Sequence, residues 1–102
     1  MRGYDRNRKD LNHASVVKAF INEGWIVEDM TAKTRFCDIH VCKPPGNAWA
    51  WVEIKDGEKK KLTPGETEFM ERCESSQSPW YRVNSAAEVP IICREILLRF
   101  AL

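Results

Sequence analysis

The feature that most constrains the fold is a pair of apolar runs with strand-like composition, residues 36–42 and 48–54. Residues two apart on a strand point to the same face of a sheet. Neither run has a purely polar face, so both strands are expected to be largely buried on both sides. Such strands indicate an α/β protein with a central sheet and helices packed on it.

Charged residues interrupt this apolar pattern. Asp38 lies in the first run, Glu53 in the second, and Lys55 follows Glu53 on the same face. Buried charges need partners or a metal ion. If the two strands pair, two carboxylates and a lysine converge, which is the set that metal-dependent phosphodiester hydrolysis needs. The spacing alone equally fits a Glu53–Lys55 or Asp38–Lys55 ion pair on a solvated edge.

The remaining pattern predicts the element order αβββαβα and a mixed sheet. A helix is expected over residues 11–22, capped by Asp10 or Asn12 and stopped by Gly24, followed by strands over 25–30, 36–42 and 48–55. A second helix begins after Thr63, and a strand over 80–84 precedes a last helix that ends at Phe100.

Local signals mark the starts of the last two helices. Thr63 fits the N-cap of the second helix, Pro64 its first position and Glu66 a capping box. Ser85 through Glu88 form another capping-box pattern, and Pro90 is expected to separate a first turn from the last helix.

Composition indicates one ordinary globular domain. The chain has 102 residues, 43% hydrophobic and 30% charged. No apolar run reaches membrane-spanning length and no signal-peptide core is present, so a cytoplasmic protein is expected. The four cysteines form no CxxC pair, which favours buried reduced thiols over disulfides or zinc.

Net charge is +1, which does not by itself indicate a nucleic-acid binder. Two basic clusters stand out: an N-terminal arm over residues 1–9, with Arg8 and Lys9, and the run Lys59, Lys60 and Lys61. A basic run is most often a solvated loop. Beside a phosphodiesterase site, both clusters become candidate contacts for DNA phosphates.

Asp38, followed after fourteen residues by Glu53-Ile-Lys55, resembles the PD-(D/E)XK nuclease signature. The segments EIKDG, KLTPGETEF and YRVNSAAEV extend the likeness, which covers about residues 10–88, to virus-type VRR-NUC domains related to Holliday junction resolvases. The resemblance implies a restriction-endonuclease-like αβββαβ(α) core within a single domain over residues 10–102. The chain departs from the family at Cys37, where Pro is common, at Glu66, where Gln is common, and in lacking a first-helix carboxylate.

The resemblance also implies the chemistry. Asp38, Glu53 and the backbone carbonyl of Ile54 would hold Mg²⁺ or Mn²⁺. Lys55 would orient the attacking water and stabilise charge on the phosphate. Glu66 fits either a plain helix cap or a water-positioning role in the site.

The resulting prediction is a metal-dependent DNA endonuclease from a phage or mobile element, acting on branched DNA. One site per chain implies a symmetric homodimer for a two-strand cut. A catalytically silent nuclease-fold protein that binds DNA or a protein partner is the main alternative, and a small restriction-type enzyme is another. His40, Trp49 and Trp51 fit packing roles better than contacts with the substrate.

Overall fold

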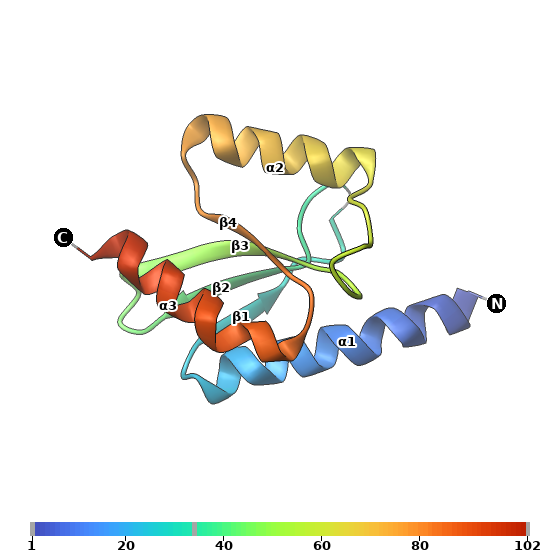
Figure 1. Cartoon of the computed structure of the whole chain (residues 1–102), viewed down its shortest axis with the longest axis horizontal. Coiled ribbons are helices and arrows are strands. Elements are labelled where there is room, and N and C mark those ends of the chain that lie inside the picture. The colour runs from blue at the N-terminus through green and yellow to red at the C-terminus, as the bar shows by residue number, and fades with distance from the viewer. Residues whose placement is uncertain (1, 34, 102) are drawn as a thin grey trace.

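A computed structural model describes the backbone of residues 2–33 and 35–101 and the side chains of residues 12–33 and 35–101. Eight elements follow in chain order (Figure 1). They are α1 (Arg2–Asn22), β1 (Ile26–Asp29), β2 (Ile39–Lys43), β3 (Ala48–Ile54), α2 (Pro64–Ser76), β4 (Trp80–Val83), the short 3₁₀ helix η1 (Ala86–Glu88) and α3 (Val89–Phe100).

The four strands form one mixed sheet in the order β1-β2-β3-β4. β1 pairs antiparallel with β2, and β2 pairs antiparallel with β3. β4 runs parallel to β3, since α2 provides the crossover between them. The predicted element order and mixed sheet are confirmed.

Helices cover both faces of the sheet (Figure 1). α1 and α3 lie together on one face, where Phe20 and Ile96 pack against β2 and β3 residues such as Val41 and Val52 in the main core. α2 lies over the opposite face, where Phe69 and a few neighbours form a smaller core. The inner strands are therefore covered on both sides, as the apolar runs predict.

The predicted helix signals of α2 are confirmed. The Thr63 side chain accepts from the Glu66 N–H, the Glu66 side chain accepts from the Thr63 N–H, and Pro64 stands at the first position. Gly24 ends α1 with a left-handed φ of 90°, which lets the Trp25 N–H reach back to the Phe20 carbonyl.

The start of α1 was predicted wrongly. The helix begins at Arg2, so neither Asp10 nor Asn12 caps it, and residues 2–9 continue the helix. These residues lack an apolar stripe, and hydrophobic periodicity therefore gave no sign of them. Arg8 and Lys9 lie among the residues whose side chains the structure does not describe, so their predicted DNA contacts stay predictions.

Two smaller expectations also need correction. Ser85 makes no side-chain cap, because Glu88 instead accepts from the Asn84 N–H. Alternation along the run 36–42 predicts Cys37 on the same face as Ile39, but Cys37 packs with Phe69 in the smaller core, whereas Ile39 lies in the main core. The alternation fails there because β2 begins only at Ile39.

The four cysteines are free thiols, as predicted, and Cys37, Cys73 and Cys93 are buried. Burial raises the pKa of both the Cys37 and Cys93 thiols to about 12, which makes them poor nucleophiles. Among the described residues, no helix combines the length and apolar character needed to cross a membrane.

Candidate active site

Asp38 stands just before β2 and is fixed to β3 by its backbone and its side chain. Its N–H donates to the Val52 carbonyl, and its Oδ2 accepts from the Ile54 N–H at 2.8 Å. These bonds extend the β2–β3 ladder beyond the strand and hold the Asp38 carboxylate beside the end of β3, where Glu53 lies. The predicted pairing of the two acid-bearing segments is therefore observed.

Glu53 is a buried ionisable residue, with 2% of its surface exposed. Burial, together with the neighbouring carboxyls of Asp38 and Glu66, raises the pKa of Glu53 to about 10. Among the described residues, no ion pair joins its carboxyl group to a cation. The carboxyl groups crowded at the end of β3 therefore favour the protonated form of Glu53 when no cation is bound.

Glu66 joins the helix cap to Lys55. Its Oε1 accepts from the Thr63 N–H at 2.8 Å and lies 2.7 Å from the Lys55 Nζ. Burial favours a raised pKa for Glu66, but the Lys55 ammonium and the Thr63 N–H outweigh burial and hold this pKa below its ordinary value. In the described part of the chain Lys55 therefore pairs with Glu66, and neither the Glu53–Lys55 nor the Asp38–Lys55 pair forms.

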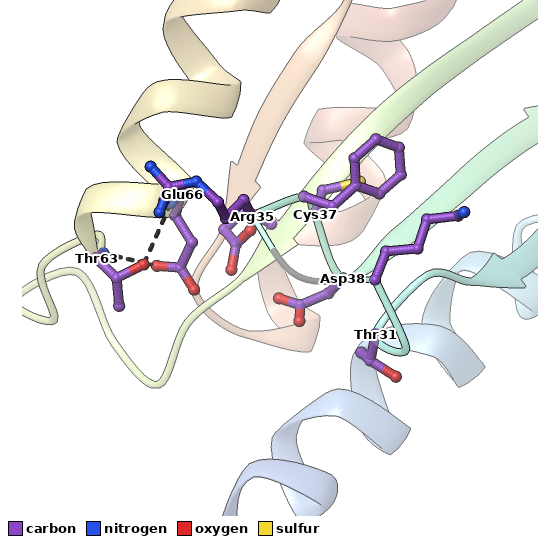
Figure 2. Close-up of a pocket in the computed structure, with 10 residues that line it drawn as sticks. Thr31, Arg35, Cys37, Asp38, Thr63 and Glu66 are labelled. Atoms are coloured by element: carbon purple, nitrogen blue, oxygen red, sulfur yellow. Dashed lines mark hydrogen bonds between the residues drawn. The ribbon is translucent and has the colours of Figure 1, made fainter.

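A pocket of about 350 Å³ opens over these carboxylates. Asp38 and Glu66 enter it from the segment before β2 and from the start of α2, and direct their carboxylates toward the same space (Figure 2). Glu53 lines the pocket between them, and Lys33 and Arg35 contribute cationic side chains. Lys55 and Ile54 lie next to this lining.

The donor set suits a hard divalent ion. Mg²⁺ is commonly held by one or two carboxylates, with waters and substrate phosphate completing its shell. Asp38 and Glu53 supply two carboxylates, and no ion pair of the described residues involves Glu53. Within the same residues, no group of three or more His, Cys, Asp or Glu side chains is arranged to hold a metal. The fit therefore rests on these two carboxylates, and the role of the Ile54 carbonyl as a third ligand stays a prediction.

Asn12 has a different role from the one its sequence position suggested. Asn12 was expected as a possible cap at the start of the first helix, but its Nδ2 donates to the Lys55 carbonyl at 2.8 Å. This bond ties α1 to the end of β3. Asn12 therefore makes a structural contact beside the end of the strand that carries Glu53.

The lysine run 59–61 is exposed on the loop that joins β3 to α2. Arg82 holds this loop in place, because its Nη2 donates to the carbonyls of Gly57, Glu58 and Lys60 while its Nε donates to Asn84. The role of Arg82 was not recognised from the sequence. Its one sequence signal is that it is a lone cation within an apolar strand.

His40 and the strand tryptophans form an aromatic cluster. The His40 ring lies 5.7 Å from Trp49 and 4.7 Å from Trp51, and Trp49 also packs on Phe100. Burial lowers the pKa of His40. These residues do not line the acidic pocket, in agreement with their predicted packing roles.

Comparison with solved structures identifies a domain with the same arrangement. A chain described as a VRR_NUC domain aligns with a TM-score of 0.69 and 20% sequence identity, covering 84% of this chain and 94% of that one. Neither a protein-family model nor a curated protein matches the sequence. At this identity the likeness establishes the fold, and it confirms the predicted restriction-endonuclease-like α/β architecture.

Proposed function

We propose that the protein is a metal-dependent endonuclease that hydrolyses phosphodiester bonds in DNA. The observation that carries this proposal is the convergence of Asp38, Glu53 and Glu66 on one pocket, with Lys55 paired to Glu66 beside it. The fold is that of a VRR_NUC domain, and nuclease chemistry fits this group of side chains.

Mg²⁺ or Mn²⁺ would be held by Asp38, Glu53 and the Ile54 carbonyl. When bound, such an ion lowers the pKa of a coordinated water and neutralises charge on the scissile phosphate. The protein contributes a fixed cradle: the Ile54 N–H orients Asp38, and burial among carboxylates leaves Glu53 in need of a cation. If these charged residues served only as structural ion pairs, Lys55 would pair with Glu66, and Glu53 would have no cationic partner among the described residues.

Lys55 and Glu66 act as a pair in this scheme. The Lys55 ammonium orients the attacking water and stabilises charge on the phosphate. Glu66 anchors that ammonium at 2.7 Å, and the capping box of α2 in turn holds Glu66. Glu66 is thus a positioning residue whose cap and site roles are compatible, because both use the same carboxylate.

DNA is the proposed substrate, and branched DNA the proposed form. The exposed lysines at 59–61 stand on the loop that follows the acidic strand and would contact phosphates next to the cleaved bond. Two strands of a junction require two sites, so a symmetric dimer is the proposed active form.

Cleavage of a four-way junction and of a linear duplex with the same sequence tests the proposal, with Mg²⁺, Mn²⁺ or EDTA in parallel reactions. Cleavage is expected with either metal and should be lost in EDTA. It should be faster on the junction than on the duplex. Equal rates on both substrates would remove the preference for branched DNA, and cleavage in EDTA would overturn the metal dependence.

A silent DNA-binding protein is the second candidate, favoured by Asn12 at the first-helix position. Calorimetric titration with Mg²⁺ separates the two candidates. Heat of binding that disappears in Asp38→Asn supports the nuclease. DNA binding without metal binding supports the silent protein.

A further inference from the structure

The loop between β1 and β2 places two cations in the pocket that the mechanism above does not use. Lys33 and Arg35 line the same pocket as Asp38, Glu53 and Glu66. One wall is therefore acidic, as a metal site requires, and the loop adds positive charge to the same space. A substrate with several anionic groups matches this division of charge.

Hydrogen bonds hold both ends of this loop. The Met30 N–H donates to the Asp38 carbonyl at 2.8 Å, and the Lys33 N–H donates to the Met30 carbonyl. Asp29 accepts from the Thr31 N–H and hydroxyl, which fixes the first turn. The loop that carries the cations is thus tied directly to the candidate catalytic Asp38.

Arg35 lines the pocket near Glu66 and Thr63 at the start of α2 (Figure 2), and it pairs with Glu68 of the same helix. Its φ of 55° is left-handed, an uncommon conformation for a residue other than glycine. A Cβ at Gly65 would lie 3.3 Å from the Arg35 Cα and 3.2 Å from its Cγ, so glycine permits this close approach.

The guanidinium of Arg35 has an exchangeable partner. Its Nε donates to the Glu68 Oε1 at 2.9 Å, and the two side chains are 62% and 52% exposed. Exposed ion pairs contribute about 0–1 kcal/mol. A phosphate offers a guanidinium two parallel hydrogen bonds and can displace such a carboxylate.

The pocket has space for more than one phosphate group. Its volume of about 350 Å³ is many times the space that one water molecule needs. Lys33 is exposed and lines the pocket, so its ammonium can reach an anion that enters it.

We propose that Lys33 and Arg35 form a second phosphate-binding subsite, which takes a backbone phosphate adjacent to the scissile one on the same DNA strand. The inference rests on the proposed nuclease function and deepens it. Two phosphates bound on one strand would set the position of the cleaved bond between the carboxylates and the cationic loop.

The test measures DNA binding in EDTA, without cleavage, over a range of salt concentrations. Lys33→Ala and Arg35→Ala should each lower the slope of log affinity against log salt by about 0.9 on duplex, or about 0.7 on a single strand. Lys18→Ala and Arg94→Ala, on the helices that cover the other face, are the matched controls and should leave the slope unchanged.

DNA with a single neutral methylphosphonate locates the phosphate. One substitution beside the scissile position should weaken wild-type binding, while Lys33→Ala and Arg35→Ala should show no further loss on that substrate. If every substitution weakens the variants as much as the wild type, the two cations do not contact a particular phosphate and the subsite is overturned.

Glu68→Gln separates phosphate binding from a structural role of Arg35. If Arg35 binds phosphate, removing its competing carboxylate should preserve or tighten DNA binding. If Arg35 only braces the loop through Glu68, Glu68→Gln and Arg35→Ala should weaken binding alike, which contradicts the proposal.

The outcomes distinguish this inference from the proposed function. Wild-type protein that neither binds nor cleaves DNA would overturn both. Wild-type protein that cleaves DNA with metal, while Lys33→Ala and Arg35→Ala behave like the two control variants, would overturn the subsite alone.

Discussion

Glu53→Gln should stabilise the metal-free protein, and by an amount that depends on pH. The Glu53 pKa is raised from its ordinary 4.5 to about 10, so the folded state holds this proton more tightly than the unfolded state does. The stability that Glu53 contributes is therefore full below pH 4.5 and is lost as pH rises toward 10. A neutral amide of the same shape avoids this loss.

The size of the effect follows from the pH. At pH 7 the folded state keeps Glu53 protonated, and the gap from 4.5 to 7 at 1.36 kcal/mol per pH unit corresponds to about 3 kcal/mol. Glu53→Gln should then exceed the wild type by about 3 kcal/mol in free energy of unfolding at pH 7. The two proteins should be nearly equal near pH 4.5.

Urea unfolding in EDTA between about pH 5 and pH 8 measures this difference. Glu95→Gln, an exposed change on α3, is the control and should stay within about 0.5 kcal/mol of wild type. Adding Mg²⁺ should stabilise the wild type and leave Glu53→Gln unchanged. A difference between Glu53→Gln and wild type that does not vary with pH would refute the account of Glu53 as a carboxyl crowded by other carboxyls.

Other variants test the cap, the lysine loop and the assembly. Glu66→Gln should keep stability and most cleavage, whereas Glu66→Ala should lose about 0.5–2 kcal/mol with the cap and far more activity; unchanged cleavage by the folded Ala variant would leave Glu66 as a cap alone. Replacing residues 59–61 with Ala should lower the salt slope of duplex binding by roughly 0.9 per lost contact, and an unchanged slope would assign them to solvated surface. Light scattering at micromolar concentration should report twice the 11.8 kDa chain mass, and a monomer that nicks junctions symmetrically would contradict the dimer.

The parts of the fold that depend on local chemistry could be predicted from the sequence. Thr63, Pro64 and Glu66 specify the start of α2 through contacts within one turn, and Gly24 ends α1 in the same local way. The apolar run of β3 marks a strand covered on both faces. Its alternation places Glu53 on the same face as Trp51, and in the structure Trp51 packs on the smaller core under α2 while Glu53 lines the pocket.

Features that depend on distant parts of the chain could not be predicted. The Lys55–Glu66 pair forms only once α2 docks over β3, so spacing favoured Lys55 partners on the strands instead. The hydrogen bonds from Arg82 to the lysine loop form only because β4 lies beside β3. The left-handed backbone at Arg35 precedes the displaced start of β2, which no hydrophobic pattern reveals.

The central claim is that Asp38 and Glu53 hold a divalent ion for phosphodiester hydrolysis, and single-turnover cleavage of junction DNA in Mg²⁺ tests it most directly. Asp38→Asn and Glu53→Gln should abolish cleavage while their far-ultraviolet circular dichroism matches the wild type. Asp56→Asn, an exposed change on the loop after β3, should cleave at the wild-type rate. Cleavage at the wild-type rate by either Asp38→Asn or Glu53→Gln would contradict the account.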